Sequence, residues 1–189
     1  MRILLASKSP RRRELVSQLG YPVEIVRVDV DEQVSTGWPS NKVAERLAQR
    51  KAEAFDTDSL QPDDVLLTAD TVVVLDGQVL GKPHTREEAT AMLHRLSNHT
   101  HTVYTGVCLR TINRSATFTE ATTVHFARLS DSMIDHYIDH YHPYDKAGAY
   151  GIQEWIGMVG IRAIEGCYYN VMGLPVARIY AELQRMGLL

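Results

Sequence analysis

Apolar runs separated by turn residues predict that the chain begins with strands of a sheet. Residues 3–6 are uniformly apolar, and residues 23–28 form a second short run, so both are predicted as strands. The run Val65–Leu75 is rich in β-branched side chains and is predicted to be a central strand. An Asp-Gly pair follows this run, which is typical of a hairpin and predicts a returning strand over residues 78–80.

The second half of the chain continues this pattern. Residues 101–112 and 116–129 alternate between apolar and polar positions and predict two long, paired antiparallel strands. Residues 144–155 are rich in small and polar side chains and predict a loop. Two shorter apolar stretches, residues 156–164 and 168–172, predict further strands.

Helical spacing and capping signals alternate with these strands. Ser9 and Pro10 suit the N-cap and first position of a helix that ends near Gly20. Four other stretches have apolar residues at helical spacing, and they begin at Ser40, Thr85, Ser130 and Pro175. Because helices and strands interleave closely without a linker or a repeat, the sequence predicts an α/β fold with a mixed sheet, as one domain over residues 1–189.

Three consecutive arginines occupy the first turn of the first predicted helix. The N-terminus of a helix is already partly positive, so an exposed cation there is unfavourable by roughly 0.3–1 kcal/mol. An anion would remove the conflict, because free backbone N–H groups and guanidinium forks both bind phosphate. Arg11, Arg12 and Arg13 are therefore candidate phosphate ligands, and the alternative is that the arginines point into solvent or pair with acids.

Asp70 interrupts the most apolar predicted strand. A buried carboxylate must be hydrogen-bonded, ion-paired or bound to a cation. This residue is therefore a candidate metal ligand or general base, and the alternative is an aspartate that only holds a neighbouring loop. Lys51, on the inner side of its predicted helix, and Lys82, between Gly81 and Pro83, are candidate phosphate ligands, or otherwise lysines with purely structural or exposed positions.

Acidic residues follow the second predicted strand, at Asp29, Asp31 and Glu32. A solvated loop explains them, but Glu32 together with Asp70 also suits a hard cation such as Mg²⁺ or Mn²⁺. We find no histidine pair at metal-binding spacing, no nucleophile elbow and no Walker-type glycine loop. Cations, one or two buried acids and no covalent nucleophile together favour attack of water on a phosphoanhydride.

Composition argues against several other classes of protein. The net charge of −3 argues against general binding of DNA or RNA. The two isolated cysteines form no disulfide framework, and we expect a reducing, cytoplasmic location. The apolar run at the start of the chain is too short for a signal peptide, and no run reaches the roughly 20 residues of a membrane span.

Several motifs resemble one known family. LASKSPRRREL, DVDE, LAQRKA, ADTVV, GKP, YDKAGAYGIQ and YYNVMGLP occur in the order found in Maf-type nucleoside triphosphate pyrophosphatases, also called septum-formation proteins. The resemblance implies hydrolysis of a nucleoside triphosphate to its monophosphate and pyrophosphate with a divalent cation. It also implies an elongated, two-lobed, ITPase-like fold, with a mixed twisted sheet, flanking helices and a central cleft, and a protein that is often a homodimer.

The resemblance also assigns roles to residues. It implies that Asp70 accepts the proton of the attacking water and neighbours the metal, and that Glu32 occupies an acidic position of the cleft. The implied phosphate ligands are Ser7, Arg11, Arg12, Lys51 and Lys82. Arg12, Thr71 and Gln153 match the positions that mark the branch acting on dTTP and UTP.

Alternatives remain open within and beyond this family. One branch prefers 7-methyl-GTP, and methylated UTP or CTP are further substrates to consider, in a house-cleaning role. The sequence departs from the common family pattern at Gln49-Arg50 and at Cys167. A nucleotide-binding regulator of septum formation without useful turnover is the rival from another class, but a pure binder has no need for a general base at Asp70.

Overall fold

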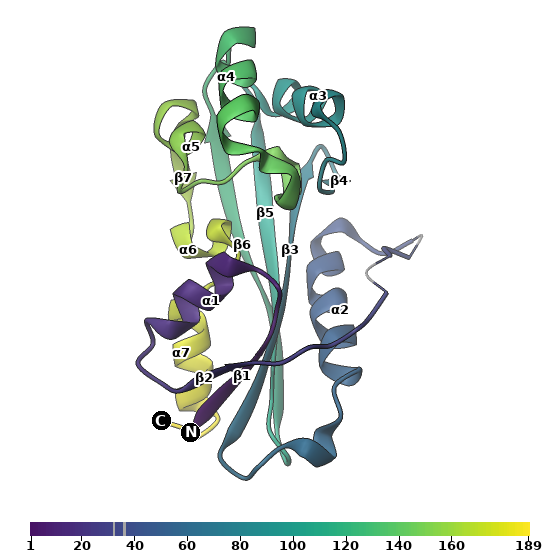
Figure 1. Cartoon of the computed structure of the whole chain (residues 1–189), viewed down its shortest axis with the longest axis vertical. Helices are drawn as coiled ribbons and strands as arrows, with labels where there is room; N and C mark the ends of the chain where they lie inside the picture. The colour runs from purple at the N-terminus through teal and green to yellow at the C-terminus, as the bar shows by residue number, and fades with distance from the viewer. Residues whose placement is uncertain (32, 36) are drawn as a thin grey trace. The chain divides into compact units, whose positions relative to one another are not determined.

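The computed structural model describes residues 1–31, 33–35 and 37–189 (Figure 1). Its strands are β1 (Arg2–Ala6), β2 (Val23–Ile25), β3 (Asp64–Leu75), β4 (Gln78–Leu80), β5 (Thr100–Arg110), β6 (Ser115–Phe126) and β7 (Ile161–Glu165). Its α-helices are α1 (Pro10–Ser17), α2 (Ser40–Glu53), α3 (Arg86–Leu96), α4 (Asp131–Tyr141), α5 (Trp155–Gly160), α6 (Tyr168–Met172) and α7 (Val176–Arg185). Three short 3₁₀ helices cover Thr57–Ser59, Pro143–Asp145 and Ala147–Ala149.

The strands form one mixed sheet. Their order is β2-β1-β3-β5-β6-β7, and β4 pairs with β3 beside this path. The β1 strand runs parallel to both β2 and β3, whereas the β3–β4 and β6–β7 pairs are antiparallel. The predicted α/β class with a mixed sheet is therefore confirmed.

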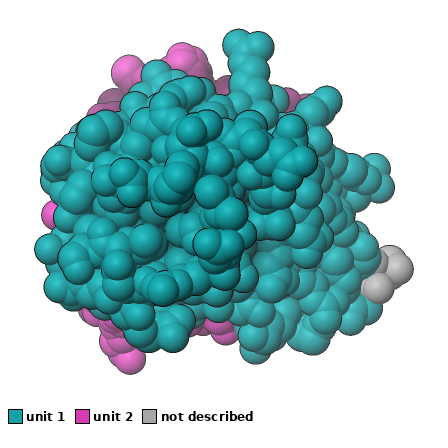
Figure 2. All heavy atoms as spheres, turned by 90° about the horizontal axis from the view of Figure 1, so that it is seen from below, with its two compact units in different colours: residues 1–70, 105–120, 173–189 teal, residues 71–104, 121–172 magenta. Residues whose placement is uncertain are grey.

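The chain divides into two compact units, coloured separately in Figure 2. Unit 1 contains residues 1–70, 105–120 and 173–189, and unit 2 contains residues 71–104 and 121–172. The long strands β3, β5 and β6 each contribute residues to both units.

In unit 1, α2 covers one face of the strands, and α1 and α7 cover the other (Figure 1). Small side chains of α2 pack against Leu4 and Leu66 from the strands. Gly106 of β5 makes this close approach feasible, because a Cβ there would lie 2.3 Å from backbone atoms of α2. On the same helix, the guanidinium carbons of Arg46 and Arg50 lie 5.0 and 4.9 Å from the ring centroid of Trp38.

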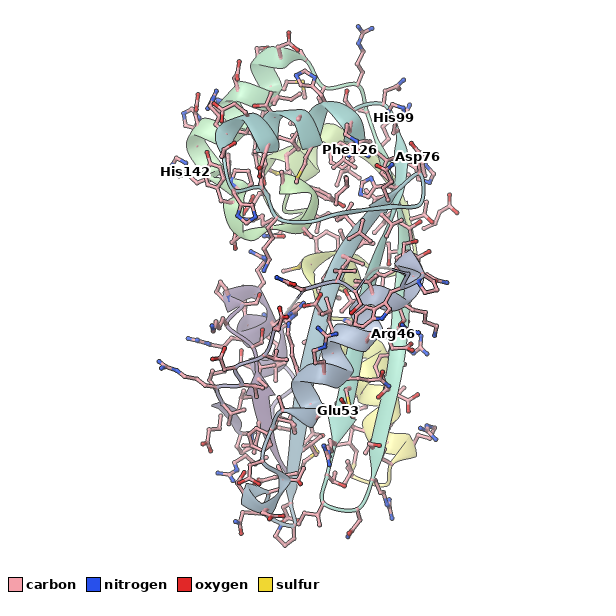
Figure 3. The ribbon with its side chains drawn as sticks, turned by 90° about the vertical axis from the view of Figure 1, so that its right-hand side faces the viewer. Arg46, Glu53, Asp76, His99, Phe126 and His142 are labelled. Atoms are coloured by element: carbon pink, nitrogen blue, oxygen red, sulfur yellow. The ribbon has the colours of Figure 1, made fainter. Side chains whose placement is uncertain are left out.

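In unit 2, helices α3 and α4 pack together over an apolar core that includes Leu93, Phe126 and Ile134. This core also encloses His101, which is 2% exposed. In the same unit, Trp155 at the start of α5 meets His136 of α4 edge to face, with 4.7 Å between ring centroids. Figure 3 labels Phe126 together with the exposed residues Asp76 and His99 of unit 2.

Most predicted elements are confirmed, but two strands are wrong. Residues 155–160 form α5, and only Ile161–Glu165 continue as a strand. Residues 168–172 form α6, in which buried Asn170 donates to the Val103 carbonyl (3.1 Å) and to Thr122 Oγ1 (2.9 Å). The predicted strand 23–28 is also shorter than expected, since pairing with β1 ends at Ile25. Within the described residues, we find no helix with both the length and the apolar character needed to cross a membrane.

Candidate functional site

The turn between β1 and α1 is built as the sequence predicts. Pro10 occupies the first turn of α1, and the side chain of Ser9 accepts a hydrogen bond from the Arg12 backbone N–H (3.4 Å). Ser7 Oγ accepts from the Ser9 N–H at 3.2 Å. These two serine side chains fix the direction in which α1 leaves the sheet, and therefore fix where its arginines start.

Arg12 contacts the backbone of unit 1 rather than pointing away from it. Its Nε donates to the Gly173 carbonyl at 2.8 Å. One terminal nitrogen donates to the Ala69 carbonyl at 2.9 Å and lies 3.4 Å from Ser7 Oγ. Because Ala69 immediately precedes Asp70, Arg12 ties the first turn of α1 to the candidate base. Arg11, on the same turn, is half-buried.

Lys51 and Asp70 form an ion pair in unit 1. The distance from Lys51 Nζ to Asp70 Oδ1 is 2.7 Å, and the two side chains are 11% and 15% exposed. One turn earlier in α2, the Ala48 carbonyl accepts a hydrogen bond from Thr68 Oγ1 at 2.7 Å. This second contact locks α2 against β3, so the ammonium and the carboxylate are held in register. The sequence singled out both residues but did not predict that they pair.

The donor chemistry at Asp70 fits a hard cation, because a carboxylate oxygen is a suitable ligand for Mg²⁺ or Mn²⁺. Glu32, the second expected ligand, lies outside the described residues. Among residues 1–31, 33–35 and 37–189, no group of three or more His, Cys, Asp or Glu side chains gathers as a metal site.

Unit 2 carries the other three predicted site residues. Thr71 follows Asp70 directly in β3 and is half-buried, whereas Lys82 and Gln153 are exposed in loops. The Gly81 carbonyl accepts a hydrogen bond from the Gly148 N–H at 3.0 Å. This bond connects the loop that carries Lys82 to the segment that leads to Gln153.

A buried polar network lies beside Gln153, and the sequence analysis missed it. Lys146 is 8% exposed, and its Nζ lies 2.7 Å from Asp145 Oδ1 and 3.1 Å from Glu154 Oε1. Tyr137 donates a hydrogen bond to the other oxygen of Glu154. Burial, followed by the neighbouring Glu154 carboxylate, raises the pKa of Tyr137, so its hydroxyl stays protonated. A lysine within a loop of small residues was the only signal of this network in the sequence.

The structure thus groups the predicted residues within each unit. In unit 1, Ser7, Arg12, Lys51 and Asp70 are joined by direct contacts or through Ala69. In unit 2, the loops of Lys82 and Gln153 are joined through Gly81 and Gly148. Peptide continuity between Asp70 and Thr71 links the two sets along the chain.

Comparison with known proteins gives consistent matches along the chain. Residues 2–186 match the family model described as Maf-like protein. The dTTP/UTP pyrophosphatase of Phocaeicola vulgatus is 48% identical over 186 residues, which cover 98% of this chain and 96% of that protein. The dTTP/UTP pyrophosphatase of Porphyromonas gingivalis strain W83 is 50% identical over 188 residues, covering 98% and 94%.

A solved structure supports the fold. The Staphylococcus aureus Ham1 protein aligns with a TM-score of 0.54 over 97% of this chain and 100% of that chain, at 14% sequence identity. At this identity the likeness concerns the fold alone, and it agrees with the mixed sheet and flanking helices described above. The family match and the relatives, in contrast, extend over nearly the whole chain. The chain belongs to the Maf-like protein family.

Proposed function

We propose that this protein is a nucleoside triphosphate pyrophosphatase that hydrolyses dTTP and UTP to the monophosphate and pyrophosphate. The observation that carries the proposal is the Lys51–Asp70 ion pair in the unit that also holds the arginine-rich start of α1. This arrangement places a carboxylate and several cations within one unit. The names of the relatives with about 50% identity point to the same reaction.

In the proposed reaction, Asp70 accepts a proton from the attacking water. The water oxygen forms a bond to phosphorus as the bond to the bridging oxygen between the α- and β-phosphates breaks, and pyrophosphate leaves. Lys51 keeps the Asp70 carboxylate oriented, since it lies only 2.7 Å from Oδ1. Ser7, Arg11, Arg12, Lys51 and Lys82 bind phosphate oxygens and offset their charge.

A divalent cation belongs to this proposal. Asp70 and Glu32 would hold Mg²⁺ or Mn²⁺, which would neutralise phosphate charge when it is bound. The preferred metal is to be found by assaying the protein with each cation after removal of bound metal by a chelator. We expect negligible turnover without a divalent cation.

We propose that Arg12, Thr71 and Gln153 select the base. A glutamine amide offers one donor and one acceptor group, and so does the edge of uracil or thymine. The exposed side chain of Gln153 supports this role, because it is accessible to a ligand. Methylated UTP would be accepted by the same amide wherever the methyl group leaves that edge unchanged, whereas methylated CTP, with its donor and acceptor in the reverse order, would require the amide to turn over.

The test is pyrophosphate release from a panel of nucleoside triphosphates, comparing wild type with Asp70→Asn. We expect dTTP and UTP to be the best substrates, and we expect Asp70→Asn to lower kcat at least about 100-fold, as for loss of a general base. Asp76→Asn is the matched control, because Asp76 lies in the turn after the same strand at a φ of 49°, which asparagine tolerates. This control should retain wild-type activity.

Other outcomes would redirect the proposal. If 7-methyl-GTP is the best substrate, the reaction stands and the proposed roles of Arg12, Thr71 and Gln153 are wrong. If no nucleotide is hydrolysed, or Asp70→Asn is as active as wild type, the catalytic proposal fails. A nucleotide-binding regulator of septum formation would then be the better explanation.

We further propose that the protein works in the cytoplasm, because Cys108 and Cys167 are both free thiols, as expected in a reducing compartment. A homodimer, the assembly implied by the family resemblance, stays a prediction for light scattering. The absence of nucleic-acid binding likewise stays a prediction, which a DNA-binding titration at moderate salt would check.

A further inference from the structure

Gln153 lies in a tight turn whose ends are hydrogen-bonded to each other. The Glu154 N–H donates to the Gly151 carbonyl at 3.0 Å. Of the two residues between them, Ile152 is buried and Gln153 is exposed. The turn therefore presents one polar side chain, and the orientation of its amide depends on how firmly residues 151 and 154 are held.

The hydroxyl of Tyr137 holds both of these residues. It accepts a hydrogen bond from the Gly151 N–H at 3.0 Å, and it donates to the Glu154 carboxylate. Tyr137 belongs to α4 and is fully buried, so its ring has little freedom to move. A single oxygen atom on a rigid helix thus fixes the beginning and the end of the turn.

Lys146 provides the charge that makes this arrangement stable. A carboxylate that is largely removed from water, such as that of Glu154 at 19% exposure, is costly unless a cation and hydrogen bonds surround it. Glu154 has both, with Lys146 Nζ at 3.1 Å from one oxygen and the Tyr137 hydroxyl on the other. Lys146 is in turn paired with Asp145 at 2.7 Å. The carboxylate of Glu154 is therefore held on two sides.

Gly151 leaves room for the amide of Gln153. A Cβ atom at Gly151 would lie 2.9 Å from Gln153 Nε2 and 3.0 Å from the carboxylate of Glu154. Such contacts are too close for ordinary packing, so any side chain at residue 151 would displace the amide or the carboxylate. The orientation of the Gln153 side chain thus depends on a glycine as well as on the hydroxyl of Tyr137.

We propose that Tyr137 and Glu154, supported by Lys146, are positioning residues that hold the Gln153 amide for recognition of the base. This inference rests on the proposed function, because it takes from it the role of Gln153 in base selection. A fixed amide presents its donor and acceptor in one order, and only bases with the complementary order then bind well. None of the three positioning residues needs to touch the nucleotide.

The first experiment compares Tyr137→Phe with Tyr141→Phe. Both residues lie on α4 and their rings stack at 5.1 Å, but only Tyr137 contacts the turn through the hydrogen bonds described above. Base preference is measured as the ratio of kcat/KM for dTTP to that for dCTP, because the edge of cytosine presents its donor and acceptor in the reverse order. We expect Tyr137→Phe to lower this ratio about tenfold, mainly through KM for dTTP, while Tyr141→Phe keeps the wild-type ratio.

The variant Gln153→Ala removes the amide and shows how much of the base preference depends on it. If the tyrosine acts through the amide, adding Tyr137→Phe to Gln153→Ala should not lower the base preference further. A structural effect unrelated to the amide would instead add to that of Gln153→Ala. Gly151→Ala provides an independent variant, because it displaces the amide while the hydroxyl of Tyr137 remains, and it should lower the ratio in the same way.

Equilibrium binding separates this inference from the proposed reaction. Calorimetric titration with α,β-imido analogues of dTTP and dCTP reports base preference without turnover, and circular dichroism verifies that each variant is folded. If wild type prefers another base and both Tyr137→Phe and Gln153→Ala lose that preference, the proposed substrate is wrong and the positioning role is supported. If Tyr137→Phe and Gly151→Ala keep the wild-type preference, or if wild type has none, the positioning role is overturned.

Discussion

His101 lies in the core of unit 2, where Tyr150 meets its ring edge to face at 5.4 Å between centroids. Its Nε2 is 2.7 Å from the Tyr150 hydroxyl, and its Nδ1 has no hydrogen-bond partner among the described residues. Burial, and then the charge of nearby His125, lower the pKa of His101 from 6.5 to about 4. The imidazole is therefore neutral in the folded protein at pH values where an unfolded chain would already bind a proton.

This difference predicts a loss of stability in acid. The pKa of His101 is lower in the folded protein than in the unfolded chain. Its contribution to the free energy of unfolding is therefore complete above pH 6.5 and is lost as the pH falls toward 4. At about 1.4 kcal/mol per pH unit, the free energy of unfolding should fall by roughly 3 kcal/mol over this window. Urea denaturation at several pH values measures the slope.

The variant His101→Gln should have a smaller slope than wild type between pH 6.5 and 4, because glutamine does not titrate there. His99→Gln is the control, since His99 is exposed two residues earlier in the chain (Figure 3), and it should retain the wild-type slope. An unchanged slope in His101→Gln would contradict the assignment of the acid sensitivity to His101.

At this same scale, the sequence indicated candidate residues for the site but did not predict the contacts between them. Asp70 was expected to need a partner, since a carboxylate in an apolar strand is costly alone. Its partner Lys51 is 19 residues away on another element, so the pair depends on how α2 packs onto β3. Arg12 was expected to bind phosphate, yet its contacts with the carbonyls of Ala69 and Gly173 depend on chain segments far apart in sequence.

Among the elements, the position of α2 depends on one glycine of β5. A Cβ at Gly106 would lie 2.3 Å from the carbonyl carbon and oxygen of Ala44 and from the backbone nitrogen of Glu45. Backbone atoms cannot move aside as the end of a side chain can, so Gly106→Ala would push the helix away from the sheet. Lys51 would move with α2.

We therefore expect Gly106→Ala to lower the free energy of unfolding by about 3 kcal/mol, at the upper end of overpacking effects. Activity per folded molecule should also fall, because the Lys51–Asp70 pair would no longer be in register. Urea denaturation and pyrophosphate release measure the two effects. Gly81→Ala serves as the stability control, because a Cβ there has open space around it. Wild-type stability of Gly106→Ala would show that α2 adjusts without cost.

Long elements were predictable from sequence, whereas the short helices α5 and α6 were not. In long elements such as β3 and α4, the apolar pattern extends over enough residues to predict a strand or a helix. The five residues of α6 contain two tyrosines and a valine, a composition typical of strands. They form a helical turn in which the Asn170 side chain donates hydrogen bonds to residues of β5 and β6. These acceptors are far away in sequence, so the residues around Asn170 do not predict the contacts.

For the whole molecule, unit 1 depends on the last part of the chain. Within residues 173–189, Leu174, Ile179, Leu183 and Met186 are all buried. Each such side chain stabilises the folded state by roughly 1.5–3 kcal/mol, so together they approach the whole stability of a typical domain. The same segment supplies the Gly173 carbonyl that Arg12 contacts.

A chain that ends at Met172 should therefore fail to fold unit 1 and should lack activity. Limited proteolysis would show this as rapid cleavage within residues 1–70, in contrast to protection in the full-length protein. A chain that lacks only the exposed residue Leu189 is the control and should be protected like the full-length protein. Protection of the chain that ends at Met172 would show that α7 is dispensable.

The two tryptophans give each unit its own fluorescent reporter. Trp38 contacts the guanidinium groups of Arg46 and Arg50 in unit 1, and Trp155 contacts the imidazole of His136 in unit 2. Because the two indoles lie in different units, the emission of Trp38 should change when unit 1 unfolds, and the emission of Trp155 should change when unit 2 unfolds. In the single-tryptophan variants Trp38→Phe and Trp155→Phe, the order in which the units unfold becomes directly visible by spectroscopy.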